Sequence, residues 1–84
     1  MFDGRHCTQK DLDLLLKETK NIKKHQQNPD KINSFLDFVA RFDRDIADKM
    51  RRQITSFPND VERIIDTNIS SLIQNVTVDI YEHQ

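Results

Sequence analysis

The segment from Asn28 to Phe57 decides the fold, and it reads NPDKINSFLDFVARFDRDIADKMRRQITSF. Its large apolar residues recur at spacings of three and four, which is the period of an amphipathic α-helix. They cover an arc of about 120°, which is wide enough to contact two neighbouring helices. The pattern predicts one long central helix from Pro29 to Ser56. The apolar stripe consists of Ile32, Phe35, Leu36, Val39, Phe42, Ile46, Met50, Ile54 and Phe57.

Two proline-containing pairs mark the ends of this helix. Asparagine is a favoured N-cap and proline is tolerated at the first helical position, so Asn28-Pro29 starts it. The residue before a proline avoids the α conformation, so Phe57-Pro58 ends it. Flanking helices are expected near Gln9–Gln26 and Asp60–Val76. The prediction is an all-α fold, a small three-helix bundle (up-down-up) with short loops. An extended helical hairpin that completes its core only by dimerising is the alternative.

The two ends of the chain carry weaker signals. Residues 1–7 are expected to form a flexible lead-in, with Phe2 as its one large apolar group. Residues 76–81 alternate apolar and polar side chains, as a β-strand does, but Val76 and Ile80 also continue a helical stripe. Helix and strand both stay open there, and residues 77–84 are a possible extended tail.

Composition narrows the class of protein. A chain of 84 residues, 36% of them hydrophobic and 32% charged, predicts one domain with a small core. The net charge of −1 gives no overall attraction to nucleic acid. No apolar run approaches the roughly 18 residues of a membrane span, and the first residues do not resemble a signal peptide. The single Cys7 cannot form an internal disulfide, so we expect a soluble, cytoplasmic protein.

Reactive side chains do not gather in the pattern that chemistry needs. His6 and Cys7 are adjacent, and the predicted bundle places His25 and His83 at its opposite end, so no metal site is expected. Cys7 has only His6 beside it, with no acid to orient a base, so nucleophilic catalysis is not expected either. The sequence therefore predicts a protein that is not an enzyme and binds no cofactor.

A protein–protein interaction module remains, and helix lengths suggest where it binds. A first helix of about 18 residues is ~27 Å long, whereas a central helix of about 28 residues is ~42 Å long. The first helix would then cover the second only to about residue 47, which leaves an apolar groove beyond it. Phe2, a second copy of the chain or a helix of another protein would fill this groove. The predicted protein-binding residues are Met50, Ile54, Phe57, Val61 and Ile65, with Arg51 and Arg52 at the rim to select an acidic partner.

Nucleic-acid binding is the alternative function. Basic residues cluster in the first helix and in the second half of the central one, as phosphate contacts would require. Against this, the last helix is acidic, and aspartates are interleaved with the arginines. The residues of this alternative are Lys17, Lys20, Lys24, Arg41 and Arg44.

Overall fold

The computed structural model describes residues 7–82, and they form an all-α fold, as the sequence predicts. No β-strand occurs in these residues. The elements are α1 (Gln9–Lys24), α2 (Pro29–Ala40), α3 (Arg44–Ser56), a single 3-10 turn η1 (Pro58–Asp60) and α4 (Val61–Glu82).

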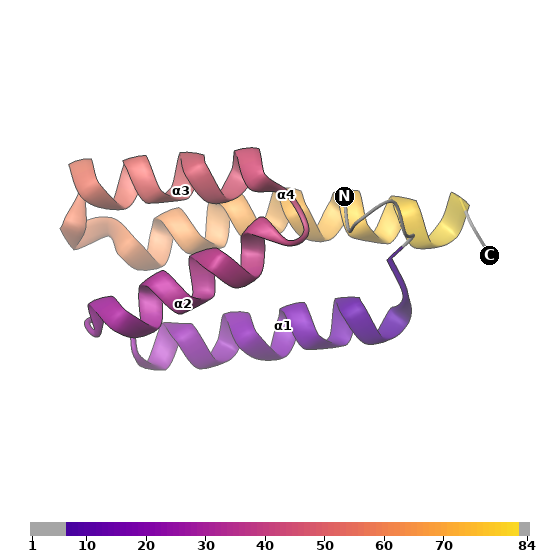
Figure 1. Ribbon diagram of the computed structural model, residues 1–84, viewed down its shortest axis with the longest axis horizontal. Coiled ribbons are helices and arrows are strands. Elements are labelled where there is room, and N and C mark those ends of the chain that lie inside the picture. The colour runs from indigo at the N-terminus through magenta and orange to yellow at the C-terminus, as the bar shows by residue number, and fades with distance from the viewer. Residues whose placement is uncertain (1–6, 83–84) are drawn as a thin grey trace.

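The helices pack in the order in which they follow one another along the chain. Each helix has Cα atoms within 8 Å of the next one, and so do α1 and α4, whereas α1 and α3, and α2 and α4, do not approach each other this closely. Figure 1 shows that consecutive helices run in opposite directions, with α3 and α1 at opposite edges of the view and α2 and α4 between them. The molecule is elongated, with extents of 39 × 21 × 19 Å.

The single central helix predicted from Pro29 to Ser56 is wrong, and with it the count of three helices. The structure divides this segment into α2 and α3, which pack against each other. One helix of this length would measure about 42 Å. That exceeds the longest extent of the molecule, 39 Å. The break lets the second half of the segment fold back beside the first.

Asp43 causes the break. Its backbone is extended (φ −156°, ψ 106°), and its Oδ1 accepts hydrogen bonds from the N–H groups of Asp45 (3.0 Å) and Ile46 (3.2 Å). An aspartate N-cap of this kind satisfies donors that the first turn of a helix leaves free. The apolar spacing conceals the break, because Val39, Phe42 and Ile46 keep the separations of three and four that a continuous helix would show.

The other helices begin at the predicted residue or one residue away from it. Thr8 and Asp11 form a capping box at the start of α1, in which each side chain bonds the other residue's backbone N–H. The Oδ1 of Asn28 accepts from the N–H groups of Asp30 (3.1 Å) and Lys31 (3.3 Å) at the start of α2. The helix after Pro58 begins one residue later than expected, at Val61, because η1 precedes it.

One hydrophobic core fills the space between the helices. Most of the predicted apolar stripe faces this core. The buried residues of the stripe are Phe35, Leu36, Val39, Phe42 and Met50, whereas Ile32, Ile46 and Ile54 are half-buried and Phe57 is exposed. Asn68 is a polar residue inside this core. Its Nδ2 donates to Gln53 Oε1 (2.7 Å) and to the Ile64 carbonyl (2.8 Å), so it joins α3 to α4 without leaving a polar atom unsatisfied. The buried apolar residues are Leu15, Ile22, Phe35, Leu36, Val39, Phe42, Ala47, Met50, Val61, Ile64, Ile65, Ile69, Leu72 and Val76.

The C-terminal segment is helical as far as the structure describes it. α4 continues to Glu82, so residues 76–81 form helix and not strand, and residues 77–82 are not an extended tail. With 22 residues α4 is the longest helix described, and Figure 1 shows its last turns reaching past α3 beside the start of α1. Residues 1–6 and 83–84, which include most of the predicted flexible lead-in, lie outside the described residues.

Candidate functional site

A cleft lies at the end of the molecule that carries both prolines, and we call it the proline-end cleft. Its volume is about 900 Å³. The α1–α2 loop, the start of α2, the end of α3, η1 and the start of α4 surround it. Its apolar lining consists of Ile32, Ile54 and Val61, with Pro29 and Pro58 beside them. Its polar lining consists of Gln26, Gln27, Asn59, Asp60, Glu62, Arg63, Asp66 and Thr67.

The two prolines explain why the cleft forms at this end. Both helix junctions that contain a proline lie here, because consecutive helices run in opposite directions (Figure 1). Pro58 keeps Phe57 out of the α conformation (φ −132°, ψ 69°), although the Phe57 N–H still bonds the Gln53 carbonyl at 2.8 Å. The Phe57 side chain is left 60% exposed next to the cleft-lining Pro58.

Only part of the predicted protein-binding set is accessible. Met50 (0% exposed) and Ile65 (1%) are enclosed in the core, so they do not line an open groove. Val61 is largely buried but reaches the cleft, and half-buried Ile54 lines it too. The predicted groove depended on a central helix of about 42 Å that extends past the first helix. The break at Asp43 divides this helix, so the groove does not form as predicted. Phe2, considered as an occupant of the groove, lies outside the described residues.

The two predicted rim arginines differ in their surroundings. Arg51 joins α3 to α2, because its guanidinium donates to Asn33 Oδ1 (3.3 Å) and lies 3.7 Å from Asp37 Oδ1. Arg52 is exposed and makes no side-chain hydrogen bond or ion pair within residues 7–82. Neither arginine lines the cleft.

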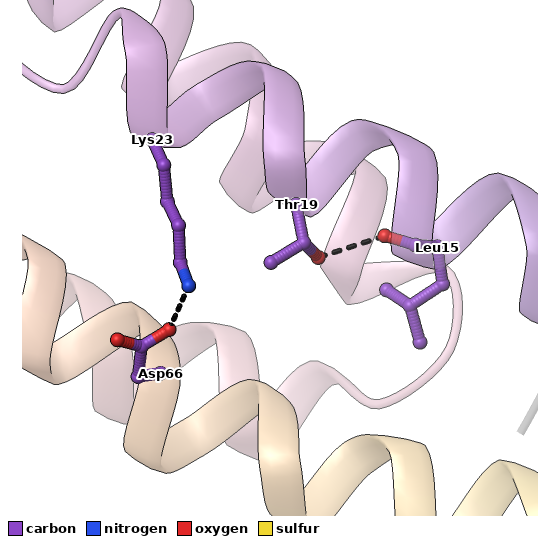
Figure 2. Close-up of polar contacts among 4 residues, drawn as sticks. All are labelled: Leu15, Thr19, Lys23 and Asp66. Carbon is purple, nitrogen blue, oxygen red and sulfur yellow. Dashed lines mark hydrogen bonds and ion pairs between the residues drawn. The ribbon is translucent and has the colours of Figure 1, made fainter.

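The cleft instead carries a small excess of negative charge. Asp60, Glu62 and Asp66 line it together with Arg63, which gives −3 + 1 = −2. Figure 2 shows that Lys23 of α1 reaches across to Asp66 of α4 and forms an ion pair, which leaves −1. Asp60 and Glu62 form no ion pair with any described residue. A partner that carries basic residues would therefore complement this cleft.

The same face of α1 shows how the helix is held against α4. One turn before Lys23, the Thr19 hydroxyl is buried and donates to the Leu15 carbonyl at 2.7 Å (Figure 2). This bond satisfies the hydroxyl inside its own helix, so Thr19 is buried without leaving its hydroxyl unpaired. The Lys23–Asp66 ion pair connects α1 to α4 at the edge of the cleft.

The residues of the nucleic-acid alternative are all exposed, but they are divided between three elements. Lys17, Lys20 and Lys24 lie on α1, whereas Arg41 follows α2 and Arg44 begins α3. No Cα atom of α1 lies within 8 Å of a Cα atom of α3. The lysines of α1 and Arg44 at the start of α3 therefore do not lie on two helices that pack side by side.

Cys7 is the one described residue that could serve as a thiol nucleophile. Its backbone N–H donates to Asp79 Oδ2 (2.7 Å), which ties the start of the described chain to the end of α4. Burial raises the pKa of the Cys7 thiol, and the nearby carboxylates of Asp79 and Asp11 raise it further. The thiol is thus held in its protonated, less nucleophilic form.

Neither a cluster of metal ligands nor a membrane-spanning helix is present in the described residues. Between Cys7 and Glu82, no group of three or more histidine, cysteine, aspartate or glutamate residues is arranged to hold a metal ion. None of the helices in this range has the length and hydropathy that crossing a membrane requires.

Comparison with known proteins was made at three levels. No protein-family model matches the chain, no curated protein matches it, and no solved structure matches it.

Proposed function

We propose that this protein is a non-catalytic protein–protein interaction module, a small cytoplasmic regulator, inhibitor or accessory subunit, that binds its partner in the proline-end cleft. The observation that carries the proposal is the meeting of Ile32, Ile54 and Val61 in an open cleft of about 900 Å³. Phe57 adds an exposed aromatic ring next to it. Half-buried Ile32 and Ile54, together with this ring, form an apolar surface that a partner would cover.

The shape and charge of the cleft suggest the kind of partner. Its lining comes from several helix ends, so it is bordered on more than one side, as are grooves that receive the apolar face of a helix. The net negative lining favours a partner helix with basic residues beside its apolar ones. This replaces the acidic partner expected from Arg51 and Arg52, because these arginines do not line the cleft.

A site-specific cross-linking experiment tests this proposal. The photoreactive phenylalanine analogue p-benzoylphenylalanine replaces Phe57, and in a matched control it replaces Val78, which is similarly exposed (54%) on the far half of α4. Both variants are irradiated in cells of the source organism. We expect a captured protein from position 57 and not from position 78. Capture from position 78 alone would contradict the proposal, and capture of the chain itself would identify a homo-oligomer.

Purified partner then allows a quantitative test. Ile54→Asp places a charge in the apolar lining, and Phe57→Ser removes the exposed ring with little effect on the core. Each variant is expected to weaken binding at least about tenfold by isothermal titration calorimetry, as loss of an apolar anchor does. Val78→Ser is the control. Unchanged affinity in both cleft variants, with helical content intact by circular dichroism, would show that the partner binds elsewhere.

Nucleic-acid binding is the alternative proposal, and it has a separate test. Labelled single- and double-stranded DNA and RNA are titrated at about 50 and 200 mM salt. Binding that falls steeply between these concentrations, and that is lost when Lys17, Lys20 and Lys24 are changed to Glu, would support the alternative. Absence of binding at the lower salt concentration eliminates it.

A further inference from the structure

A second, smaller pocket lies between α1 and α2 and shares no residue with the proline-end cleft. Its volume is about 290 Å³, which is near the lower limit for sites that hold small molecules. Ile22, Phe35 and Phe38 provide its apolar lining. Its polar lining consists of Glu18, Asn21, His25, Lys31 and Ser34.

Aromatic contacts hold the apolar side of this pocket in place. The Phe38 ring lies between two others, with its centroid 6.4 Å from that of Phe35 and 5.3 Å from that of Phe42. The Phe38–Phe42 pair is edge-to-face, at an interplanar angle of 74°. Phe35 and Phe42 are buried, while Phe38 is half-buried. A preformed aromatic surface lowers the entropic cost of ordering that a ligand must overcome.

The charged groups of the pocket are separated along its length. His25 and Lys31 flank the α1–α2 loop, whereas Glu18 precedes His25 by seven residues, about 10 Å along a helix axis. Within residues 7–82, none of these three side chains forms a hydrogen bond or an ion pair. One end of the apolar pocket therefore offers cationic or donor groups that the protein itself does not use, and the other end is acidic.

We propose that this pocket binds a small amphiphilic carboxylate. Its apolar body packs against Ile22, Phe35 and Phe38, and its carboxylate lies between His25 and Lys31. The position of Glu18 sets the polarity of the ligand, because a carboxylate at that end would be repelled. The spacing of about 10 Å between Glu18 and His25 fits an aryl-substituted short-chain acid of roughly a dozen non-hydrogen atoms. A ligand of this size in so small a pocket is expected to bind with a Kd on the order of 0.1–1 mM.

Nuclear magnetic resonance titration of the full chain tests this assignment. The probe is 4-phenylbutyrate, and two compounds of the same length serve as controls, the neutral 4-phenylbutanamide and the cationic 4-phenylbutylamine. We expect the acid to cause saturable amide shifts within residues 18–38, and the amide to bind at least about fivefold more weakly. The amine is expected to bind more weakly than the acid, because its ammonium group can pair only with Glu18 and not with His25 and Lys31. Equal affinity for the three compounds, no saturation, or shifts centred on the proline-end cleft would each overturn the proposal.

Matched variants test whether His25 and Lys31 bind the carboxylate specifically or whether any exposed basic residue has the same effect. The double variant His25→Gln with Lys31→Gln replaces the imidazole and the ammonium group by neutral amides, and both side chains are exposed, so the core is untouched. We expect about tenfold weaker binding of 4-phenylbutyrate, a typical effect of losing charge-assisted contacts. The control, Lys20→Gln with Lys24→Gln, also alters exposed basic residues but lies outside the pocket. Ser34→Leu narrows the pocket from an exposed position and is expected to reduce affinity too. If the His25 and Lys31 variant binds as the parent does, the proposal is wrong.

Discussion

Replacement of Asp43 by alanine tests the division of the predicted central helix. In the structure the Asp43 carboxylate accepts two backbone N–H groups, at 3.0 and 3.2 Å, and alanine accepts neither. Loss of an aspartate N-cap costs about 1 kcal/mol, within a range of roughly 0.5–2 kcal/mol. In one continuous helix the same change would instead be favourable by up to about 0.7 kcal/mol, because alanine has the higher helix propensity. The two structures thus predict effects of opposite sign.

Urea denaturation followed by circular dichroism measures this difference. A domain of this size has a stability of roughly 4–13 kcal/mol, so 1 kcal/mol is readily detected. It corresponds to about 4–8 °C in Tm. Asp48→Ala is the matched control, since Asp48 is an exposed residue inside α3 with no hydrogen bond or ion pair among the described residues. We expect Asp43→Ala to destabilise and Asp48→Ala to be neutral or stabilising. An Asp43→Ala protein as stable as the parent would refute the division into α2 and α3.

Three further measurements examine the core, an ion pair and the thiol. Phe42→Ala is expected to cost about 3–5 kcal/mol, because the ring is buried against its aromatic neighbour, and a Tm within a few degrees of the parent would contradict this. The Lys23–Asp66 pair is partly exposed, so a double-mutant cycle with Lys23→Gln and Asp66→Asn should give a coupling below about 1 kcal/mol that disappears in 1 M salt. Because burial and neighbouring carboxylates raise the pKa of Cys7, its alkylation by iodoacetamide at pH 8 should be slower in the folded chain than in urea. Asp79→Asn should accelerate it, and equal rates in folded and unfolded protein would refute the pKa shift.

Signals that act through covalent geometry predicted the fold most faithfully. Pro29 and Pro58 cannot continue a preceding helix, so both junctions lie where the sequence places them. The break at Asp43 was missed because it contains neither glycine nor proline. It depends on the side-chain hydrogen bonds of Asp43, which stabilise the start of α3 by only about 1 kcal/mol. Whether these bonds form in place of a continuous helix depends on how α2 and α3 pack, and the sequence pattern does not show that.

The candidate site was predicted in part, for a related reason. Ile54 and Val61 line the cleft because they flank the junction at Pro58, which the sequence defines. Met50 and Ile65 were expected beside them, but fold-back at Asp43 packs α2 against α3, α1 packs against α4, and both residues are buried. The contribution of Ile32 was missed, although its place in the apolar stripe was recognised. Its approach to the cleft depends on the direction of α2, which periodicity does not determine.

The contact between α1 and α4 has a consequence for folding kinetics. The other helix contacts join neighbours in the chain, and proteins dominated by local contacts fold within microseconds to milliseconds. Docking of α1 on α4 must close a much longer loop, since the Cys7–Asp79 hydrogen bond alone spans 72 residues. We expect this docking to follow the transition state, so that weakening it accelerates unfolding and leaves the folding rate nearly unchanged. The lifetime of the native state would then depend mainly on the α1–α4 contact, although this contact contributes little to how fast the chain folds.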